Sequence, residues 1–176
     1  MDYRMTTVTI KATSENKYEA ILNHKRYPCA LGRNGITSSK HEGDGATPAG
    51  CWPIREVYYR SDKITLPENI KFTAISITPE MGWSDDPEAP DYNKFIPDAS
   101  NYNYSHEKLW RDDHRYDLII NVGYNDNPPI AGKGSAIFIH VTQDYNTPSA
   151  GCITFEMEHL LEIIEMLDYD SYVDVL

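Results

Sequence analysis

Hydrophobic positions along this chain gather in short runs that are rich in β-branched and aromatic residues. Gly, Pro, Asn or Asp bounds each run, a pattern typical of β-strands. Six such runs predict strands at residues 6–12, 26–32, 51–59, 72–77, 117–123 and 135–141. The last two runs are almost continuously apolar, which indicates central strands that are buried on both faces.

One segment instead has the spacing of an amphipathic helix. Residues 156–168 place apolar side chains on one face, with acidic residues in the first turn, where the helix dipole favours negative charge. The apolar face, which we interpret as core packing, consists of Met157, Leu160, Leu161, Ile164 and Leu167. A second, short helix is expected at residues 105–112. The pattern predicts a mainly β, sandwich-like single domain over residues 1–176 with one or two helices.

Charge restricts the partners of this domain. The 176 residues carry a formal net charge of −11, and such a surface repels phosphate backbones and anionic lipid. We therefore expect neither nucleic-acid nor membrane partners. The N-terminal residues lack a basic region followed by an apolar one, so we expect a cytoplasmic protein, or a periplasmic one if an export signal has been removed.

The three cysteines, Cys29, Cys51 and Cys152, form no CxxC pair and no complete disulfide set, which favours free thiols in a reducing compartment. Potential metal ligands also occur close together between residues 105 and 117. They lack the HExxH spacing or a comparable one, so we interpret them as a solvated helix end and predict no metal and no cofactor. These potential ligands are His106, Asp112, Asp113 and His114.

Cys152 has the surroundings of a nucleophile. A thiol attacks a carbonyl group as the thiolate, so it needs a base or a lowered pKa. Gly151 before it lets a substrate approach the backbone, and the N–H groups of Gly151 and Cys152 can form an oxyanion hole. The helix that begins a few residues later would add a favourable dipole.

His140 is the better candidate for the base. It ends a predicted strand, and the eleven residues 141–151 can return the chain so that Cys152 lies beside it. His159 follows Cys152 by seven residues, which in a helix is roughly 10 Å and too far for a hydrogen bond. The alternative is that Cys152 is an inert buried thiol and His140 a core histidine.

Two motifs together resemble a known family. His140 with Ser149-Ala150-Gly151-Cys152 resembles the His…(Ser/Thr)-x-Gly-Cys signature of the L,D-transpeptidase catalytic domain, the YkuD-like family. Residues 43–54, GDGATPAGCWPI, resemble its upstream TPxG segment. This loop also has the glycine spacing of a P-loop but lacks the Lys and Ser/Thr that bind phosphate and magnesium. The resemblance extends over roughly residues 32–167.

The resemblance implies a β-sandwich enzyme that cleaves the bond between meso-diaminopimelate and D-alanine in peptidoglycan tetrapeptide stems. It makes Cys152 the nucleophile and His140 the base, and the carbonyl of Val141 can orient the imidazole. The acyl group then passes to an amine or to water. In the cytoplasm we expect water, and hence an L,D-carboxypeptidase of muropeptide recycling. The alternatives are an L,D-transpeptidase and a non-catalytic muropeptide-binding domain.

An activated thiol would separate the enzyme from the binding domain. We expect Cys152 to react with iodoacetamide faster than Cys29 and Cys51, which lie inside predicted strands. The sequence departs from the family at two positions, of which Ala150 bears on acceptor specificity. Ala150 stands where many members have a second histidine, and Thr154 where many have a basic or polar residue.

Substrate contacts are predicted from chemistry. Arg111 can hold the terminal carboxylate of a tetrapeptide, although an ion pair with Asp112 or Glu107 is the alternative. Residues 79–104 are dense in Pro, Asp, Asn and aromatic residues and predict a long ordered loop. Trp83 and Tyr92 in this loop can line a lid over the stem peptide, or the loop can pack against its own aromatic side chains.

Overall fold

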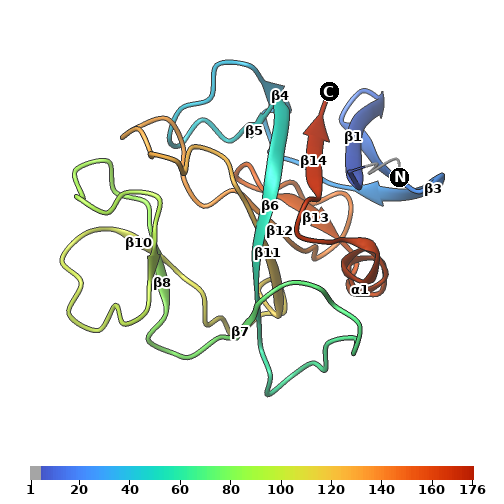
Figure 1. Ribbon diagram of the computed structural model, residues 1–176. Helices are drawn as coiled ribbons and strands as arrows, with labels where there is room; N and C mark the ends of the chain where they lie inside the picture. Colours follow the sequence, from blue (N-terminus) through green and yellow to red (C-terminus); the bar gives the residue numbers. More distant parts are fainter. Residues whose placement is uncertain (1–4) are drawn as a thin grey trace.

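Fourteen strands and one helix make up the described part of the protein, residues 5–176 of the computed structural model (Figure 1). Residues 1–4, the start of the predicted domain, lie outside it. Nine strands form the main sheet: β1 (Thr7–Ser14), β2 (Lys17–Leu22), β3 (Lys25–Cys29), β6 (Gly50–Tyr59), β7 (Ala74–Ser76), β11 (Leu118–Val122), β12 (Phe138–Val141), β13 (Ile153–Phe155) and β14 (Tyr172–Val175). The other elements are β4 (Ile36–Thr37), β5 (Thr47–Pro48), β8 (Gly82–Ser84), β9 (Phe95–Ile96), β10 (His106–Lys108) and α1 (Met157–Met166).

The long strand β6 joins two halves of the main sheet. Its first residues pair with β14, and its remainder pairs with β11 and β7. The strand order is β13-β12-β11-β6-β14-β1-β2-β3. At the two ends of this order, Ala30 and Thr154 exchange backbone hydrogen bonds of 3.0 and 2.9 Å. The sheet therefore curls until its edges meet, and its two halves enclose the main core in the predicted sandwich-like form.

Alternate residues of the central strands face two different cores. Ile139 and Val141 of β12 face the main core, to which α1 contributes Leu160, Ile163 and Ile164. Phe138 packs on the other face, with Trp83 and Cys152 in a second apolar cluster. The segment that contains β8, β9 and β10 covers this second face (Figure 1). Both faces of β11 and β12 are buried, as their continuous apolar character predicted.

All six predicted strands form, with shifted ends, and the predicted helix forms as α1. The short helix expected at residues 105–112 is wrong. His106–Lys108 is strand β10, which pairs with β8, and β8 also pairs with β9. The predicted loop 79–104 therefore contains two strands. Partners distant in sequence decide the conformation of such short polar segments, and local patterning does not record them.

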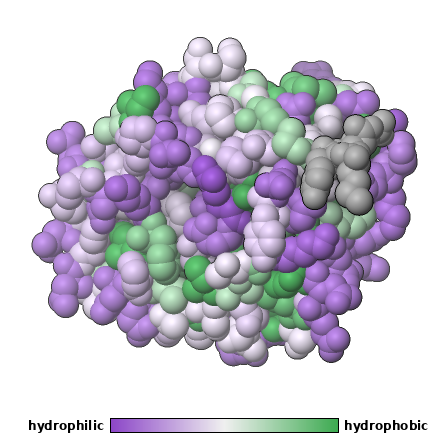
Figure 2. Space-filling view, viewed as in Figure 1, coloured by the Kyte–Doolittle hydropathy of each residue, from purple (hydrophilic) through white to green (hydrophobic). Residues whose placement is uncertain are grey.

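The face of the molecule seen in Figure 2 is mostly polar. Hydrophilic side chains spread over the face in Figure 2, and apolar ones form small, separate groups there. Over residues 5–176, no helix combines the length and the apolar character that crossing a membrane requires.

Asn93 fastens the 79–104 segment to the central sheet. Its side-chain oxygen accepts hydrogen bonds from Trp83 Nε1 (2.9 Å) and from the Ala136 amide (3.0 Å). Its side-chain nitrogen donates to the carbonyls of Tyr124 (3.0 Å) and Asn125 (2.7 Å). Asn93 is buried and adopts a positive φ of 56°, which asparagine tolerates better than most residues. One side chain thus satisfies four buried or partly buried polar groups in three separate stretches of chain.

Replacing Asn93 with alanine should lower the free energy of unfolding by about 2–4 kcal/mol, because it leaves buried donors and acceptors without partners. Urea unfolding of the purified variant measures this loss. Asn101→Ala is the matched control, since Asn101 is exposed. Equal stability of the two variants would contradict the anchoring role.

Candidate active site

The parallel pairing of β12 with β13 brings His140 and Cys152 together. Thr154 lies directly opposite His140 in this pairing. Cys152, two residues before Thr154, points to the same side of the sheet, so the Cα atoms of Cys152 and His140 are roughly 8 Å apart. Both residues line one cavity of about 230 Å³. The structure therefore brings the predicted nucleophile and base to the same site.

A backbone carbonyl orients the imidazole of His140. Its Nδ1 lies 3.0 Å from the carbonyl oxygen of Val141. A carbonyl can only accept, so Nδ1 carries the proton and Nε2 is left as an acceptor. The ring of Tyr116 packs edge-on against the imidazole, with centroids 5.1 Å apart. Burial lowers the pKa of His140 to about 4, so the ring is neutral near pH 7 and can take a proton.

The thiol of Cys152 is buried and neutral. It donates to the carbonyl of Ala136 at 3.3 Å and accepts the amide hydrogen of Phe138 at 3.4 Å. Burial raises the pKa of Cys152 to about 12. Within residues 5–176, no hydrogen bond joins this thiol to His140, so the thiol must turn away from Ala136 before His140 can take its proton.

The helix expected to lend its dipole to Cys152 does not reach it. α1 begins at Met157, and all of β13 lies between the helix and Cys152. Because the helix dipole acts within about one turn of the helix end, this part of the sequence interpretation is wrong.

Ser149 organises the turn before the nucleophile. Its hydroxyl accepts the Gly151 amide at 3.0 Å and donates to the Cys152 carbonyl at 2.6 Å. The Gly151 N–H, a predicted oxyanion donor, is therefore already engaged. Ala150, between them, is exposed and lines the cavity.

Thr47 of the TPxG segment supports this turn directly. Its hydroxyl donates to the Gly151 carbonyl and accepts the Gly32 amide, both at 2.9 Å, and the side chain is fully buried. Gly151 has a φ of 147°, and a Cβ on it would lie only 2.9 Å from the Ala46 carbonyl oxygen. The close approach of the two motifs therefore requires glycine here.

Arg111 lines the cavity, but its ion-pair partner differs from both candidates named above. Arg111 and Arg115 both bind the carboxylate of Asp113, at 2.7 and 2.8 Å. These hydrogen bonds hold the pKa of Asp113 well below its usual range. The Arg111 side chain is partly exposed, so it remains a candidate to bind a substrate carboxylate.

The potential metal ligands near Arg111 are dispersed. His106 Nδ1 lies 3.2 Å from the carbonyl of Tyr104, and His114 Nε2 lies 3.1 Å from that of Thr142. In the part of the chain that the structure describes, no three His, Cys, Asp or Glu side chains are grouped as a metal site would require.

Trp83 and Tyr92 are not brought to the cavity. Trp83 is buried against Phe138, with ring centroids 5.1 Å apart. The Tyr92 hydroxyl bonds Glu42 and accepts the Gly134 amide at 2.9 Å. Their expected contact with the stem peptide is therefore corrected in favour of the alternative, a segment that packs on its own side chains. Trp83 packs in the second apolar cluster, and the Tyr92 hydroxyl binds the loops that carry Glu42 and Gly134.

Several cavity residues were not predicted from the sequence. Glu107 accepts the hydroxyl of Tyr116 at 2.8 Å, and Tyr116 in turn packs on His140. Lys40 and Glu42 come from the loop before the TPxG segment. These residues belong to no motif, and only the fold brings them near Cys152.

The other two thiols differ from each other. Cys29 is buried, and burial raises its pKa to about 12. Cys51 lies in β6 but is exposed, so the expectation that its strand position protects it is wrong. It belongs to a face that the sheet leaves open to solvent.

Comparison with known proteins identifies the family of the chain. The sequence model of the L,D-transpeptidase catalytic domain (YkuD) matches residues 6–175. The chain belongs to the L,D-transpeptidase catalytic domain family. A solved structure of L,D-transpeptidase 1 from Mycobacterium tuberculosis is 12% identical, with a TM-score of 0.37, and the alignment covers 98% of this chain and 60% of that chain. No curated protein sequence matches significantly.

In this L,D-transpeptidase domain, replacing Thr47 with valine should lower the free energy of unfolding by about 2–3 kcal/mol, because two buried backbone groups lose their partner. It should also reduce the activity by loosening the turn at Gly151. Thr47→Ser keeps the hydroxyl and should retain most of both properties. Denaturant unfolding and turnover of the two variants check this, and equal behaviour would contradict the role of the hydroxyl.

The buried His140 should make the domain less stable in mild acid. Its folded pKa of about 4 lies below the unfolded value of 6.5, so the unfolded state binds more protons between these values. Stability should therefore fall as the pH drops from 6.5 to 4, by about 3 kcal/mol from this group. The difference between the unfolding free energies of the wild type and His140→Gln, measured across this range, isolates the effect from that of the carboxylates. A pH-independent difference would contradict it.

Proposed function

We propose that this domain catalyses acyl transfer through a Cys152 thioester, with His140 as the general base. The observation that carries the proposal is that both side chains line one cavity while Val141 holds His140 with Nε2 unprotonated. The proposed acyl donor is a peptidoglycan tetrapeptide stem, the substrate class associated with the family. The bond that is cleaved joins meso-diaminopimelate to the terminal D-alanine.

The chemistry follows from the two protonation states. The thiol proton passes to Nε2 of His140 as Sγ of Cys152 bonds to the substrate carbonyl carbon. The amide of Phe138, which already donates to Sγ, stabilises the negative charge that develops there. Collapse of the tetrahedral intermediate breaks the C–N bond, and the amine of D-alanine takes the proton back from His140. A thioester then remains on Cys152.

We propose water as the acceptor, which makes the domain an L,D-carboxypeptidase acting on muropeptides. The cavity of about 230 Å³ is smaller than most ligand sites, which hold about 300–1,000 Å³. A bound donor stem leaves little room for a second stem, whereas water needs almost none. Ala150 offers no polar side chain to an amine acceptor. Arg111, on the same cavity wall, is the proposed partner of the terminal carboxylate.

Incubation of the purified domain with a tetrapeptide muropeptide, followed by mass spectrometry, tests this function. We expect the loss of one alanine, abolished in Cys152→Ala and in His140→Ala but retained in Cys51→Ser, which changes an exposed thiol. A cross-linked dimer, or exchange of D-alanine for another D-amino acid, would identify a transpeptidase instead. Binding without any change in mass would leave a muropeptide-binding domain.

A further inference from the structure

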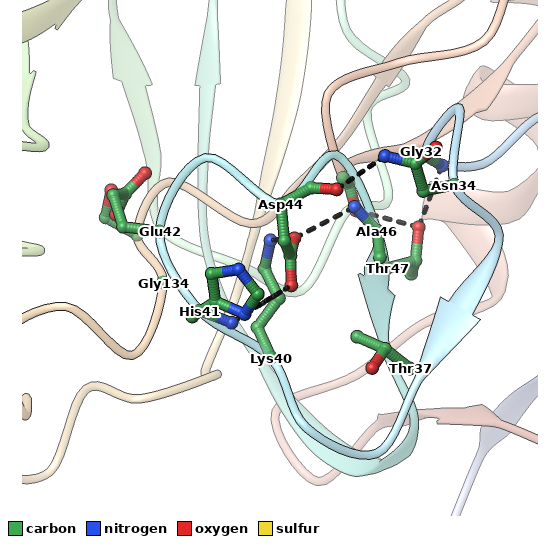
Figure 3. A network of polar contacts seen from close by, with 12 residues as sticks. Gly32, Asn34, Thr37, Lys40, His41, Glu42, Asp44, Ala46, Thr47 and Gly134 are labelled. Atoms are coloured by element: carbon green, nitrogen blue, oxygen red, sulfur yellow. Dashed lines mark hydrogen bonds and ion pairs between the residues drawn. The ribbon is translucent and has the colours of Figure 1, made fainter.

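Lys40 is a buried lysine that a carboxylate holds in place. Its side chain is 6% exposed, and its ammonium forms an ion pair with Asp44, whose side chain is 9% exposed (Figure 3). Asp44 also accepts the backbone amides of His41 (3.0 Å) and Ala46 (2.9 Å). Burial opposes ionisation of Asp44, but these three hydrogen bonds hold its pKa below the usual value. The carboxylate is thus ionised and fixes the ammonium.

The ammonium of Lys40 lies beside the residue that precedes the nucleophile. A Cβ built on Gly151 would be 3.5 Å from Lys40 Nζ, and one built on Gly134 would be 3.1 Å from the lysine stem. Lys40 and Cys152 line the same cavity. An ammonium has three donors, and Asp44 is its one hydrogen-bond partner among residues 5–176. Donors therefore remain for a group bound in the cavity.

The site needs such a donor. The attack of Cys152 turns a carbonyl oxygen into an oxyanion. Of the two predicted backbone donors, the Gly151 N–H is engaged by Ser149, which leaves the Cys152 N–H and room for a second donor. Burial is the main cause that raises the pKa of Cys152, and the Phe138 amide lowers it. The negative charge of Glu107 raises this pKa further, and the positive charge of Lys40 opposes that effect.

We propose that Lys40 is a catalytic residue whose ammonium donates a hydrogen bond to the oxyanion of the tetrahedral intermediate, and that Asp44 is the residue that positions it. The inference rests on the proposed acyl transfer. As Sγ bonds to the carbonyl carbon, the C=O electron pair moves to oxygen, and the charge is stabilised beside Lys40 without proton transfer. When the C–N bond breaks, this pair re-forms the carbonyl group and the contact weakens.

Steady-state kinetics of Lys40→Met on the tetrapeptide muropeptide test the role. We expect kcat to fall about 100–1,000-fold with KM changed less than about threefold, as for the loss of an oxyanion donor. Lys40→Arg keeps the charge and should recover part of kcat. If KM rises while kcat is retained, Lys40 binds a carboxylate of the substrate and the proposal is wrong. Unchanged kinetics would overturn it as well.

A double variant separates catalysis from structure. Lys40→Met alone leaves the buried Asp44 carboxylate unpaired, which can itself disturb the loop. Lys40→Met with Asp44→Asn removes both charges, so it should restore the thermal stability but not kcat. Recovery of kcat in the double variant would mean that Lys40 serves only to neutralise Asp44.

A measurement without substrate keeps this proposal distinct from the proposed function. In a Cys29→Ser, Cys51→Ser background, iodoacetamide labelling of Cys152 at one fixed alkaline pH should be several-fold slower in the Lys40→Met, Asp44→Asn double variant than with Lys40 present, because the thiolate loses a nearby cation. Equal labelling rates would overturn the electrostatic role of Lys40, whatever the muropeptide assay shows. Slower labelling with no muropeptide turnover would instead refute only the proposed reaction.

Discussion

The parallel pairing of β12 with β13 is the constraint on which the site depends. Neighbouring parallel strands cannot be joined by a tight turn, because the chain must return to the end of the sheet where it started. The residues between Val141 and Ile153 therefore form a loop beyond the strand ends, and this loop makes one wall of the cavity. The same pairing fixes which faces His140 and Cys152 share. One backbone arrangement thus creates both the proposed catalytic pair and the cavity that the two residues line.

Burial governs the chemistry of this pair. Removing both side chains from water favours their neutral forms, with the pKa of His140 lowered and that of Cys152 raised. The resting state is therefore a thiol beside a neutral imidazole, and charge appears only during attack. Donors that are already in place, such as the Phe138 amide at 3.4 Å from Sγ, become important at that moment. Preorganised groups of this kind lower the barrier because they need no rearrangement.

Two polar hubs hold the surrounding loops to the sheet. Thr47 fastens the TPxG segment to the turn at Gly151, and Asn93 fastens the 79–104 segment to Ala136. Ala136 in turn accepts the hydrogen bond of the Cys152 thiol. Since buried polar groups are costly when unpaired, each hub fixes its loop in one position. Buried side-chain hydrogen bonds thus hold the turn at Gly151 and the segment behind Ala136, both of which lie at the cavity.

The sequence by itself determined the class of the fold, its central strands and the amphipathic helix, and it predicted that Cys152 and His140 share one site, as the cavity shows. These features are local: a continuous apolar run, a helical period, and two motifs in order along the chain. The contact by which the Val141 carbonyl orients His140 could also be predicted, because the two residues are neighbours in sequence.

Only the tertiary structure decided the rest. Residues 106–108 form strand β10 rather than a helix because they pair with β8, more than twenty residues away in sequence. The Trp83 side chain packs in the second apolar cluster rather than against a substrate. Lys40 reaches Gly151 through the packing of two loops that share no sequence pattern. Hydrophobic periodicity indicates which residues are buried, but it does not indicate which residues they pack against. Contacts between polar side chains that are distant in sequence therefore form only when the sheet closes.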